Sequence, residues 1–384
     1  MPAPAAPATP RPGRSSSRSG GGRGRIVAPI LARHLRNGIE ESVHRGDIVE
    51  ADAAGRIIRQ LGDPDRVVTL RSTVKPFGLL ALIEAGGIEA FDLEPPEIAI
   101  LASSHSGEDL HVRTLQGIYR RSGVSQAALA CGAEGAPLDA LTAARLARDG
   151  EKAGPIRHMC SGQHTVSLLL SRMRGWDPND YWRSNHPSQI AYRAAVAQAF
   201  GTTPEKLQTA IDGCGVETYG FRLREVARAY AMFADPSAIP AGDPRADVAA
   251  SLTKIRDAML ANPEMVAGRH DRIDTSLMKA VPDRLVSKAG MEALRGVAIL
   301  PGPRTGTGEA GASGLVVKIE DGDGYDRGTW AATVEALRQA GVLDGGALRD
   351  LARYHRPTSL DPHGRVGAET IAEFELAPVG ELIG

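Results

Sequence analysis

Segments with the character of β-strands lie near both ends of this 384-residue chain, and the long stretch between them has the spacing of helices. Apolar and polar residues alternate in 39–52 and 56–61, with the turn pair Ala54-Gly55 between them. Residues 313–320 form the clearest strand of the C-terminal part. Such segments bury their apolar faces by joining one sheet. The pattern predicts an α+β fold, with an antiparallel sheet assembled from N- and C-terminal segments and a helical region inserted between them.

Shorter segments complete the expected order. Further strands are predicted at 67–70, 284–287 and 296–300. Helices are predicted at 74–85, 108–121, 163–174, 187–200, 221–233, 245–260 and 326–340. No internal repeat or linker interrupts residues 26–384, so we expect a single body with a sheet part and a helical part.

Composition excludes several classes of protein. Residues 1–25 are rich in Pro, Arg, Gly and Ser and contain no acidic residue, so we expect a disordered tail that is not a secretory signal. The net charge of −1 argues against a nucleic-acid partner, and no apolar run is long enough to span a membrane. Cys131, Cys160 and Cys214 are too few for a disulfide framework, which favours a reducing, cytoplasmic location.

One Ser-x-x-Lys motif stands at a place suited to catalysis. Ser72 follows a short β-branched strand and begins a helix, and Lys75 lies three residues on, on the same helix face. A desolvated Lys can take the proton of such a Ser. The alternative is that Ser72 is only a helix N-cap. The motif recurs at Ser251, interpreted as a helix-surface pair, and at Ser276, interpreted as a helix cap.

Two later segments strengthen the catalytic interpretation. The polar residues 103–109 directly follow an apolar run, although they could simply cap the next helix through Ser104 or Ser106. Lys288-Ala289-Gly290 ends a predicted strand. Penicillin-recognising serine enzymes carry Ser-x-x-Lys, Ser-x-Asn and Lys-Thr-Gly in that chain order. The same order occurs here, with the second and third elements degenerate.

Taken together, several segments resemble the class 3, Rhizobium-type L-asparaginases, also called the asparaginase II family. The resemblance covers about residues 35–355 and rests on the segments 38–45, 71–76, 102–109, 160–164, 212–214, 262–268 and 316–322. It implies a β-lactamase- and glutaminase-like fold, a homodimer, and hydrolysis of L-asparagine to L-aspartate and ammonia.

The resemblance also implies roles for four catalytic residues. Ser72 would be the nucleophile that forms an acyl-enzyme, with Lys75 as its base. Ser104 and Lys288 would form a second Ser–Lys pair that passes a proton to the departing ammonia.

Substrate and metal ligands follow from the same resemblance. Asp212 and Gly213, with Arg71 as a further candidate, would hold the α-amino and α-carboxylate ends of the substrate. Family members hold zinc between two cysteines and a lysine, which would here involve Cys160 and Cys214. Gln163 replaces the lysine, and an amide is the poorer ligand. Zinc is expected only as a structural or substrate-orienting ion, because the two Ser–Lys pairs already supply the nucleophile and the base. His158 and His164 could complete a rearranged site.

Other functions stay open at this point. The scaffold could serve a glutaminase, a β-lactamase or a peptidase, and one methylene separates glutamine from asparagine by only ~1–3 kcal/mol. A non-catalytic binder of a metal or small ligand would use Cys160, His164 and Cys214. In a basic-tail adaptor, function would depend on residues 1–25.

Overall fold

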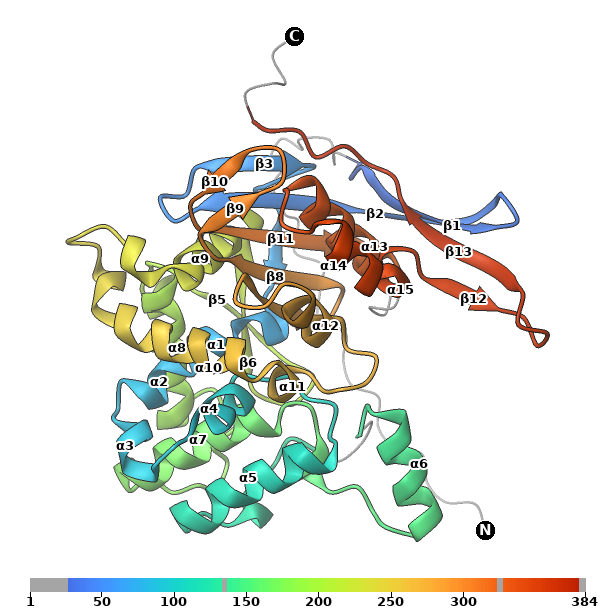
Figure 1. Ribbon diagram of the computed structural model, residues 1–384. Helices are drawn as coiled ribbons and strands as arrows, with labels where there is room; N and C mark the ends of the chain where they lie inside the picture. The colour runs from blue at the N-terminus through green and yellow to red at the C-terminus, as the bar shows by residue number, and fades with distance from the viewer. Residues whose placement is uncertain (1–26, 133–136, 323–326, 380–384) are drawn as a thin grey trace, which may run out of the picture.

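An antiparallel sheet of eight strands forms one part of the molecule and a group of helices forms the other (Figure 1). The computed structural model describes residues 27–132, 137–322 and 327–379, so the predicted tail lies outside the described residues. The strands of the sheet are β1 (Ile30–Arg36), β2 (Ile39–Asp52), β3 (Ile57–Leu61), β7 (Leu285–Gly290), β8 (Leu294–Ile299), β11 (Ser313–Ile319), β12 (Thr358–Leu360) and β13 (Val366–Ala372).

The sheet joins the two ends of the chain, as predicted. Its order is β12-β13-β1-β2-β11-β8-β7, and β3 pairs with β2. The long strand β2 pairs along its first half with β1, whereas its second half pairs with β11 on one side and β3 on the other. The α+β architecture is thereby confirmed. The sequence did not reveal β1, β12 and β13, which extend the sheet to residue 372.

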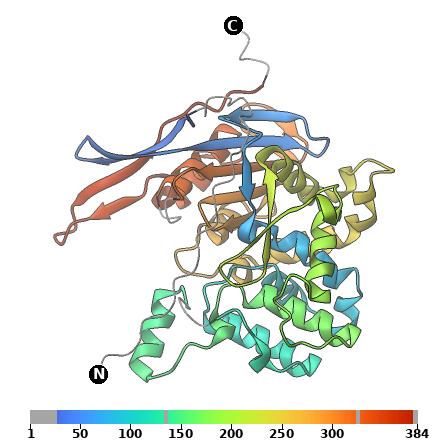
Figure 2. The same ribbon diagram turned by 180° about the vertical axis from the view of Figure 1, so that it is seen from behind.

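Helices cover both faces of this sheet (Figures 1 and 2). Helix α13 (Gly328–Gln339), with α14 (Gly345–Asp350) and α15 (Ala352–His355), lies on one face. Helix α9 (Leu223–Ala234) crosses the other face at two glycines, Gly296 and Gly314. A Cβ on Gly314 would lie 2.0 Å from the carbonyl oxygen of Ala227, so glycine is required for this close approach.

The helical part lies beside one edge of the sheet (Figure 1). Its helices are α1 (Lys75–Gly78), α2 (Leu80–Ile83), α3 (Gly87–Phe91), α4 (Pro95–Leu101), α5 (Asp109–Ser122), α6 (Ala140–Asp149), α7 (Ser161–Arg174), α8 (Pro187–Ala199), α10 (Ala249–Ala261), α11 (Pro263–Val266) and α12 (Ile273–Ala280). A second small sheet has the order β4-β6-β5, formed by β4 (Val67–Thr69), β6 (Glu217–Arg222) and β5 (Gln208–Ile211). Strands β9 (Gly302–Arg304) and β10 (Gly308–Ala310) form a hairpin.

Several predicted boundaries were wrong by a few residues. The helix predicted at 221–233 begins at Leu223, because Phe221 and Arg222 pair with β4. The helix predicted at 74–85 is a 3₁₀ turn η1 (Arg71–Val74) followed by α1 and α2. The helix predicted at 326–340 begins at Gly328, and residue 326 lies outside the described residues.

In the ranges that the structure describes, we find no helix that is both long and apolar enough to cross a bilayer.

Candidate active site

The turn that carries Ser72 is held in place by hydrogen bonds. Strand β4 leads into η1 through Arg71, whose φ of 47° is left-handed. The amide of Leu70 donates to the carbonyl of Tyr219 at 2.8 Å, and Tyr230 of α9 donates its hydroxyl hydrogen to the carbonyl of Thr73 at 2.8 Å. No side chain caps η1, whose preceding residue is Leu70, so the N-cap interpretation of Ser72 is wrong.

Two lysines converge on Ser104 in the loop between α4 and α5. The Nζ of Lys75 lies 3.2 Å from the Oγ of Ser104, 2.9 Å from the carbonyl oxygen of Ser103 and 3.3 Å from the Sγ of Cys160. The Nζ of Lys288 lies 2.8 Å from the same Ser104 Oγ. The structure thus brings Lys75, Ser104 and Lys288 into one hydrogen-bonded cluster. The described residues give no hydrogen bond between the side chains of Ser72 and Lys75.

Burial tunes the amine of Lys288. This side chain is fully buried at the end of β7. Desolvation, reinforced by the charge of nearby Lys75, holds the pKa of Lys288 well below its usual value. A neutral amine that is hydrogen-bonded to a serine hydroxyl can accept a proton from it. This cluster therefore has the chemical capacity for general base catalysis.

A buried ion pair fixes the strand that carries Lys288. Asp274 of α12 pairs with Arg295 of β8, and both side chains are almost completely buried. The same carboxylate accepts hydrogen bonds from the Ser287 hydroxyl at 2.6 Å and from the Ala289 amide at 3.1 Å. Burial alone would raise the pKa of Asp274, but Arg295 and Lys288 outweigh it and lower that pKa. Asp274 thus remains an anion that holds the two neighbours of Lys288 in β7 by hydrogen bonds.

The last residue of the Lys288-Ala289-Gly290 segment has a steric role. A Cβ on Gly290 would lie 2.8 Å from the carbonyl oxygen of Leu70 and 3.0 Å from the Thr73 side chain. The end of β7 therefore packs directly on the turn that carries Ser72, and the glycine permits this approach.

A cavity of about 280 Å³ opens onto both serines. Most of its other lining is apolar, and Arg272 adds a guanidinium whose Nη2 donates to the Ser104 carbonyl at 2.8 Å. The lining residues are Ser72, Ser104, Leu138, Met159, Asp271, Arg272, Ile273, Asp274, Ala289, Met291, Arg295 and Trp330. Sequence reasoning missed the segment 271–274, because an Asp-Arg pair before a helix carries no distinctive spacing.

The predicted substrate-holding residues lie together beside η1, the turn that carries Ser72. Arg71 Nη2 donates to Asp212 Oδ1 at 2.9 Å, and the amide of Gly213 also donates to that oxygen at 2.5 Å. These three residues are not among those that line the cavity. Arg71 nevertheless immediately precedes Ser72 in the chain.

Two of the three cysteines are in contact beside the amine cluster. A hydrogen bond from the thiol of Cys214, with the charge of Lys75 and contact with His158, lowers the pKa of Cys160 well below its usual value. The pKa of Cys214 is raised by the same hydrogen bond and by burial. Cys131 lies apart in its contacts, with its thiol donating to the Pro155 carbonyl at 3.3 Å, and burial raises its pKa to about 12.

The predicted zinc ion at Cys160, Cys214 and Gln163 stays a prediction. Gln163 lies buried in the first turn of α7, so the donors are two thiols and an amide. Structural zinc sites use four Cys, His or carboxylate ligands, and catalytic sites use three. Within the described residues, Cys160 and Cys214 belong to no group of three such ligands. His164 bonds the Tyr181 hydroxyl through Nδ1 at 2.6 Å, and its buried Nε2 has no hydrogen-bond partner among the described residues, whereas His158 contacts Cys160. This donor set fits zinc poorly.

A different group of ligand-type side chains lies nearby. Ligand atoms of Glu108, Asp139 and His270 lie within 4.8 Å of one another. Both carboxylates already accept hydrogen bonds: Glu108 from the amide and Nε of Arg269, and Asp139 from Thr142. These contacts fix loop geometry. Glu108 also caps α5, which corrects the expectation that Ser104 or Ser106 does so.

The other two Ser-x-x-Lys motifs prove structural, although not as predicted. Ser251 is buried on α10 rather than at the surface. Ser276 does not cap α12, which has no side-chain cap, and its hydroxyl lies 3.1 Å from that of Tyr354. Neither serine lines the cavity that Ser72 and Ser104 share.

Comparison with solved structures gives distant likenesses only. A protein named Mglu in its native form matches with 15% identity and a TM-score of 0.36, over 79% of this chain and 67% of its own. The probable glutaminase from Bacillus subtilis, complexed with 6-diazo-5-oxo-L-norleucine, matches with 11% identity and a TM-score of 0.38, over 78% and 84%. Another structure of a Bacillus subtilis probable glutaminase matches with 10% identity and a TM-score of 0.40, over 78% of this chain and 89% of its own. We rest no argument on these likenesses.

The comparison with protein families is decisive. A search of curated proteins gave no significant match. The family model described as L-asparaginase II, in contrast, matches residues 32–371, which include nearly all of the sheet and the Ser72, Ser104 and Lys288 segments. This chain therefore belongs to the L-asparaginase II family and is an amide-hydrolysing enzyme.

Proposed function

We propose that the protein hydrolyses the side-chain amide of L-asparagine to L-aspartate and ammonia, with Ser72 as nucleophile. The observation that carries the proposal is the buried Lys75–Ser104–Lys288 cluster beside a cavity that both serines line. Ser72 is favoured over Ser104 because two amines already engage the Ser104 hydroxyl, while Ser72 stands at the start of a helical turn. Backbone amides at such a turn can stabilise an oxyanion.

In the first step, the Ser72 Oγ would attack the amide carbon of the substrate. The new bond is C–O, and the carbonyl π electrons move to oxygen, which the backbone amides of η1 would hold. The Ser72 proton would pass to Lys75, which must be neutral at that moment. The lowered pKa of Lys288 supplies one neutral amine in the cluster, which could take a proton from Lys75 through the Ser104 hydroxyl before the attack.

In the second step, the C–N bond would break and the oxyanion would return its electrons to the carbonyl. The proton on Lys75 would move through the Ser104 hydroxyl, with Lys288 as its other neighbour, to the leaving nitrogen and complete ammonia. Water would then hydrolyse the aspartyl ester on Ser72, losing one proton to the cluster, which would return it to the serine oxygen.

Charged groups around the cavity would hold the ends of the substrate. We propose that Arg272, which lines the cavity, pairs with the α-carboxylate. Asp212, Gly213 and Arg71, which the sequence predicted at both the α-amino and the α-carboxylate ends, would then hold the α-amino end, since their cluster adjoins the Ser72 turn. Replacement of Arg272 by Gln should raise KM more than it lowers kcat, and unchanged KM would contradict this assignment.

The central experiment measures ammonia release from L-asparagine by the wild type, Ser72→Ala, Ser104→Ala and the control Ser251→Ala. Ser251 belongs to the same type of motif but lies outside the cavity, so its variant should keep its turnover. We expect Ser72→Ala to lose turnover by orders of magnitude, with its fold intact.

A second readout separates the two serines. Acid-quenched mass spectrometry should detect a trapped acyl-enzyme in Ser104→Ala but none in Ser72→Ala. An acyl adduct in Ser72→Ala would assign the nucleophile to Ser104. No ammonia from any amide with folded wild type would remove the asparaginase proposal and favour a binding role.

Glutamine is the second candidate substrate. The apolar lining of the cavity, which includes Met159 and Met291, offers room and contact for one further methylene. The preference between the two amides is then worth only ~1–3 kcal/mol. The ratio of kcat/KM for the two substrates decides which name suits the activity.

Homodimer formation and a cytoplasmic location stay predictions. Light scattering of the purified chain tests the first, and fractionation of the producing cells tests the second.

A further inference from the structure

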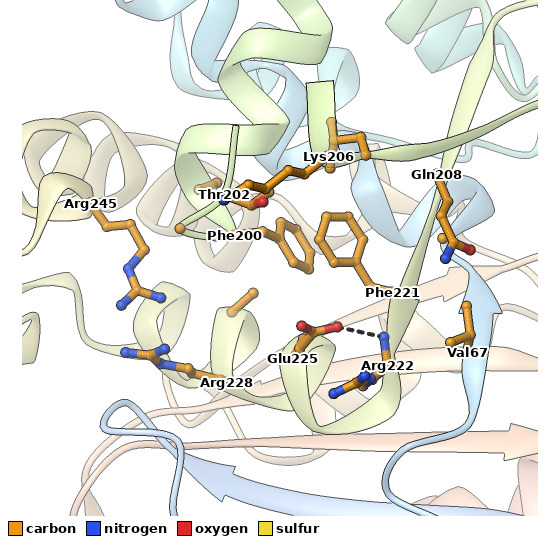
Figure 3. Close-up of a pocket in the computed structure, with 15 residues that line it drawn as sticks. Val67, Phe200, Thr202, Lys206, Gln208, Phe221, Arg222, Glu225, Arg228 and Arg245 are labelled. Carbon is orange, nitrogen blue, oxygen red and sulfur yellow. Dashed lines mark hydrogen bonds between the residues drawn. The ribbon is translucent and has the colours of Figure 1, made fainter. Parts of the chain in front are cut away.

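A second cavity lies away from the two serines, between α8, α9 and the small sheet (Figure 3). Its volume is about 450 Å³. Residues from the end of α8, from β6, from α9 and from the 3₁₀ turn η6 (Pro244–Val248) line it. None of the proposed catalytic or substrate-holding residues is among them.

The charged side chains of this cavity are mainly cationic. Lys206, Arg222, Arg228 and Arg245 line it, whereas Glu225 is its only carboxylate among the lining residues. Figure 3 shows the guanidinium groups of Arg228 and Arg245 lying toward one another across one side. Two like charges in this arrangement repel each other, and an anion placed between them would relieve that repulsion.

The carboxylates that protein folding supplies leave part of this charge uncompensated. Arg245 pairs with Asp243, to which its Nε donates at 2.7 Å. The same carboxylate forms a long ion pair with Arg228, with 3.9 Å between Asp243 Oδ2 and Arg228 Nη2, so one carboxylate faces two guanidiniums. Among the described residues, Arg228 has one hydrogen bond, from its Nε to the Ala53 carbonyl at 3.2 Å. The Nε bond orients the guanidinium without neutralising it. In the described part of the chain, its terminal nitrogens have only the long ion pair with Asp243, so they can still donate hydrogen bonds to a ligand.

An aromatic wall adjoins the cationic side. The rings of Phe200 and Phe221 are stacked, with centroids 4.1 Å apart and an angle of 27° between their planes. Both line the cavity, and Phe200 is only partly buried (Figure 3). A flat ring would extend such a stack favourably.

We propose that this cavity binds a small organic anion in which a phosphate or carboxylate group is attached to a flat ring. The anionic group would lie between Arg228 and Arg245, with Lys206 and Arg222 adding long-range attraction. The ring would lie against Phe200. The site is separate from the amide-hydrolysing centre and does not depend on the proposed asparagine substrate.

Calorimetric titration with phenyl phosphate tests the proposal on the intact chain. We expect saturable binding at one site, and Arg228→Gln should weaken it by about tenfold or more, as befits a lost charge-assisted contact. Arg224→Gln is the matched control, because Arg224 lies one turn earlier on α9, pairs with Asp65 and does not line the cavity. The control should bind as the wild type does.

Three further outcomes decide the details. Thermal denaturation without ligand should show each variant folded; if Arg228→Gln fails this check, Arg222→Gln replaces it, with an expected weakening of a few-fold. Inorganic phosphate should bind more weakly than phenyl phosphate, and equal affinity would overturn the role of the aromatic wall. Equal losses in Arg228→Gln and Arg224→Gln, or no saturable binding of phenyl phosphate by the wild type, would overturn the site itself.

Discussion

The cavity at Ser104 and the cavity at Phe200 both have cationic side chains beside them, but these side chains differ in burial and in charge. Around Ser104, Lys75 and Lys288 are buried and hydrogen-bonded to one hydroxyl, and desolvation favours the neutral form of Lys288. Around Phe200, Arg228 is partly exposed and keeps its charge, although burial and the charge of Arg245 lower its pKa somewhat. Lysine can lose its proton when buried, whereas arginine cannot. Burial thus suits one cavity for proton transfer and exposure suits the other for attracting anions.

The largest expected effect comes from a substitution that puts a permanent cation beside the cavity of Ser72 and Ser104, as the arginines do in the cavity of Phe200. Lys288→Arg would place a permanent cation beside Ser104 and remove the neutral amine from the proton relay. We expect turnover to fall about a hundredfold to ten-thousandfold, the usual contribution of general acid–base catalysis. Ammonia release measures this effect. The control Lys279→Arg, at an exposed lysine paired with Glu264, should leave the rate unchanged. Comparable rates in wild type and Lys288→Arg would remove Lys288 from the chemistry.

A second prediction concerns the ion pair that supports the same strand. Asp274→Asn would leave Arg295 as an unpaired buried cation, which typically costs about 3–5 kcal/mol of unfolding free energy. Denaturant titration measures this loss. Asp271→Asn is the control, because Asp271 pairs with Arg353 at the exposed surface, where ion pairs contribute little. Similar stabilities for the two variants would show that burial does not set the strength of the Asp274 pair.

The pH profile sharpens the contrast further. Because the pKa of Lys288 lies well below its usual value, its neutral form persists down to that lowered pKa. Activity should therefore be retained above the lowered pKa and fall as the pH drops through it. Asp274 favours the charged form of Lys288, so Asp274→Asn should move the acid limb to lower pH in the protein that remains folded. An acid limb that does not move would contradict this coupling.

The smallest expected effect is the change in stability caused by Arg228→Gln in the cavity at Phe200. Without a ligand, Arg228→Gln removes one of two facing guanidiniums and one hydrogen bond to Ala53. These changes oppose each other, so we expect a stability change within about 0.5 kcal/mol, as for most surface substitutions. Thermal denaturation at low and high salt measures it. A loss as large as that of Asp274→Asn would show that the Arg228 charge is structural.

The sequence predicted the architecture better than the contacts. The segments 39–52 and 313–320 revealed two central strands, although β11 and the second half of β2 are buried at nearly every position rather than on one face only. Strands β12 and β13 were missed because Gly, Pro and charged residues around 358–372 mask their alternation. Helix α9 was predicted two residues early because Phe221 is buried in β6 as it would be in a helix.

For the site, chain order revealed more than spacing. The order of the Ser72, Ser104 and Lys288 segments led to residues that the fold does bring together. The Ser-x-x-Lys spacing suggested a contact between Ser72 and Lys75. Lys75 instead donates to the Ser104 segment, because its long flexible side chain can reach acceptors outside its own helix. Arg272, Asp274 and Arg295 had no signal, because their roles depend on tertiary contacts between α12 and β8.

The pairing of β1 with β13 affects how the chain folds during its synthesis. Ala32 pairs with Ala372, so the outer part of the sheet joins residues that leave the ribosome far apart in time. Until β11 and β13 have been made, β1 and β2 present unpaired edges while the helical segments between them have already emerged. Exposed edges of this kind invite pairing between chains. Slow translation of the segment between β2 and β13 would lengthen that vulnerable period, and a chaperone that covers β1 and β2 would reduce the risk of pairing between chains.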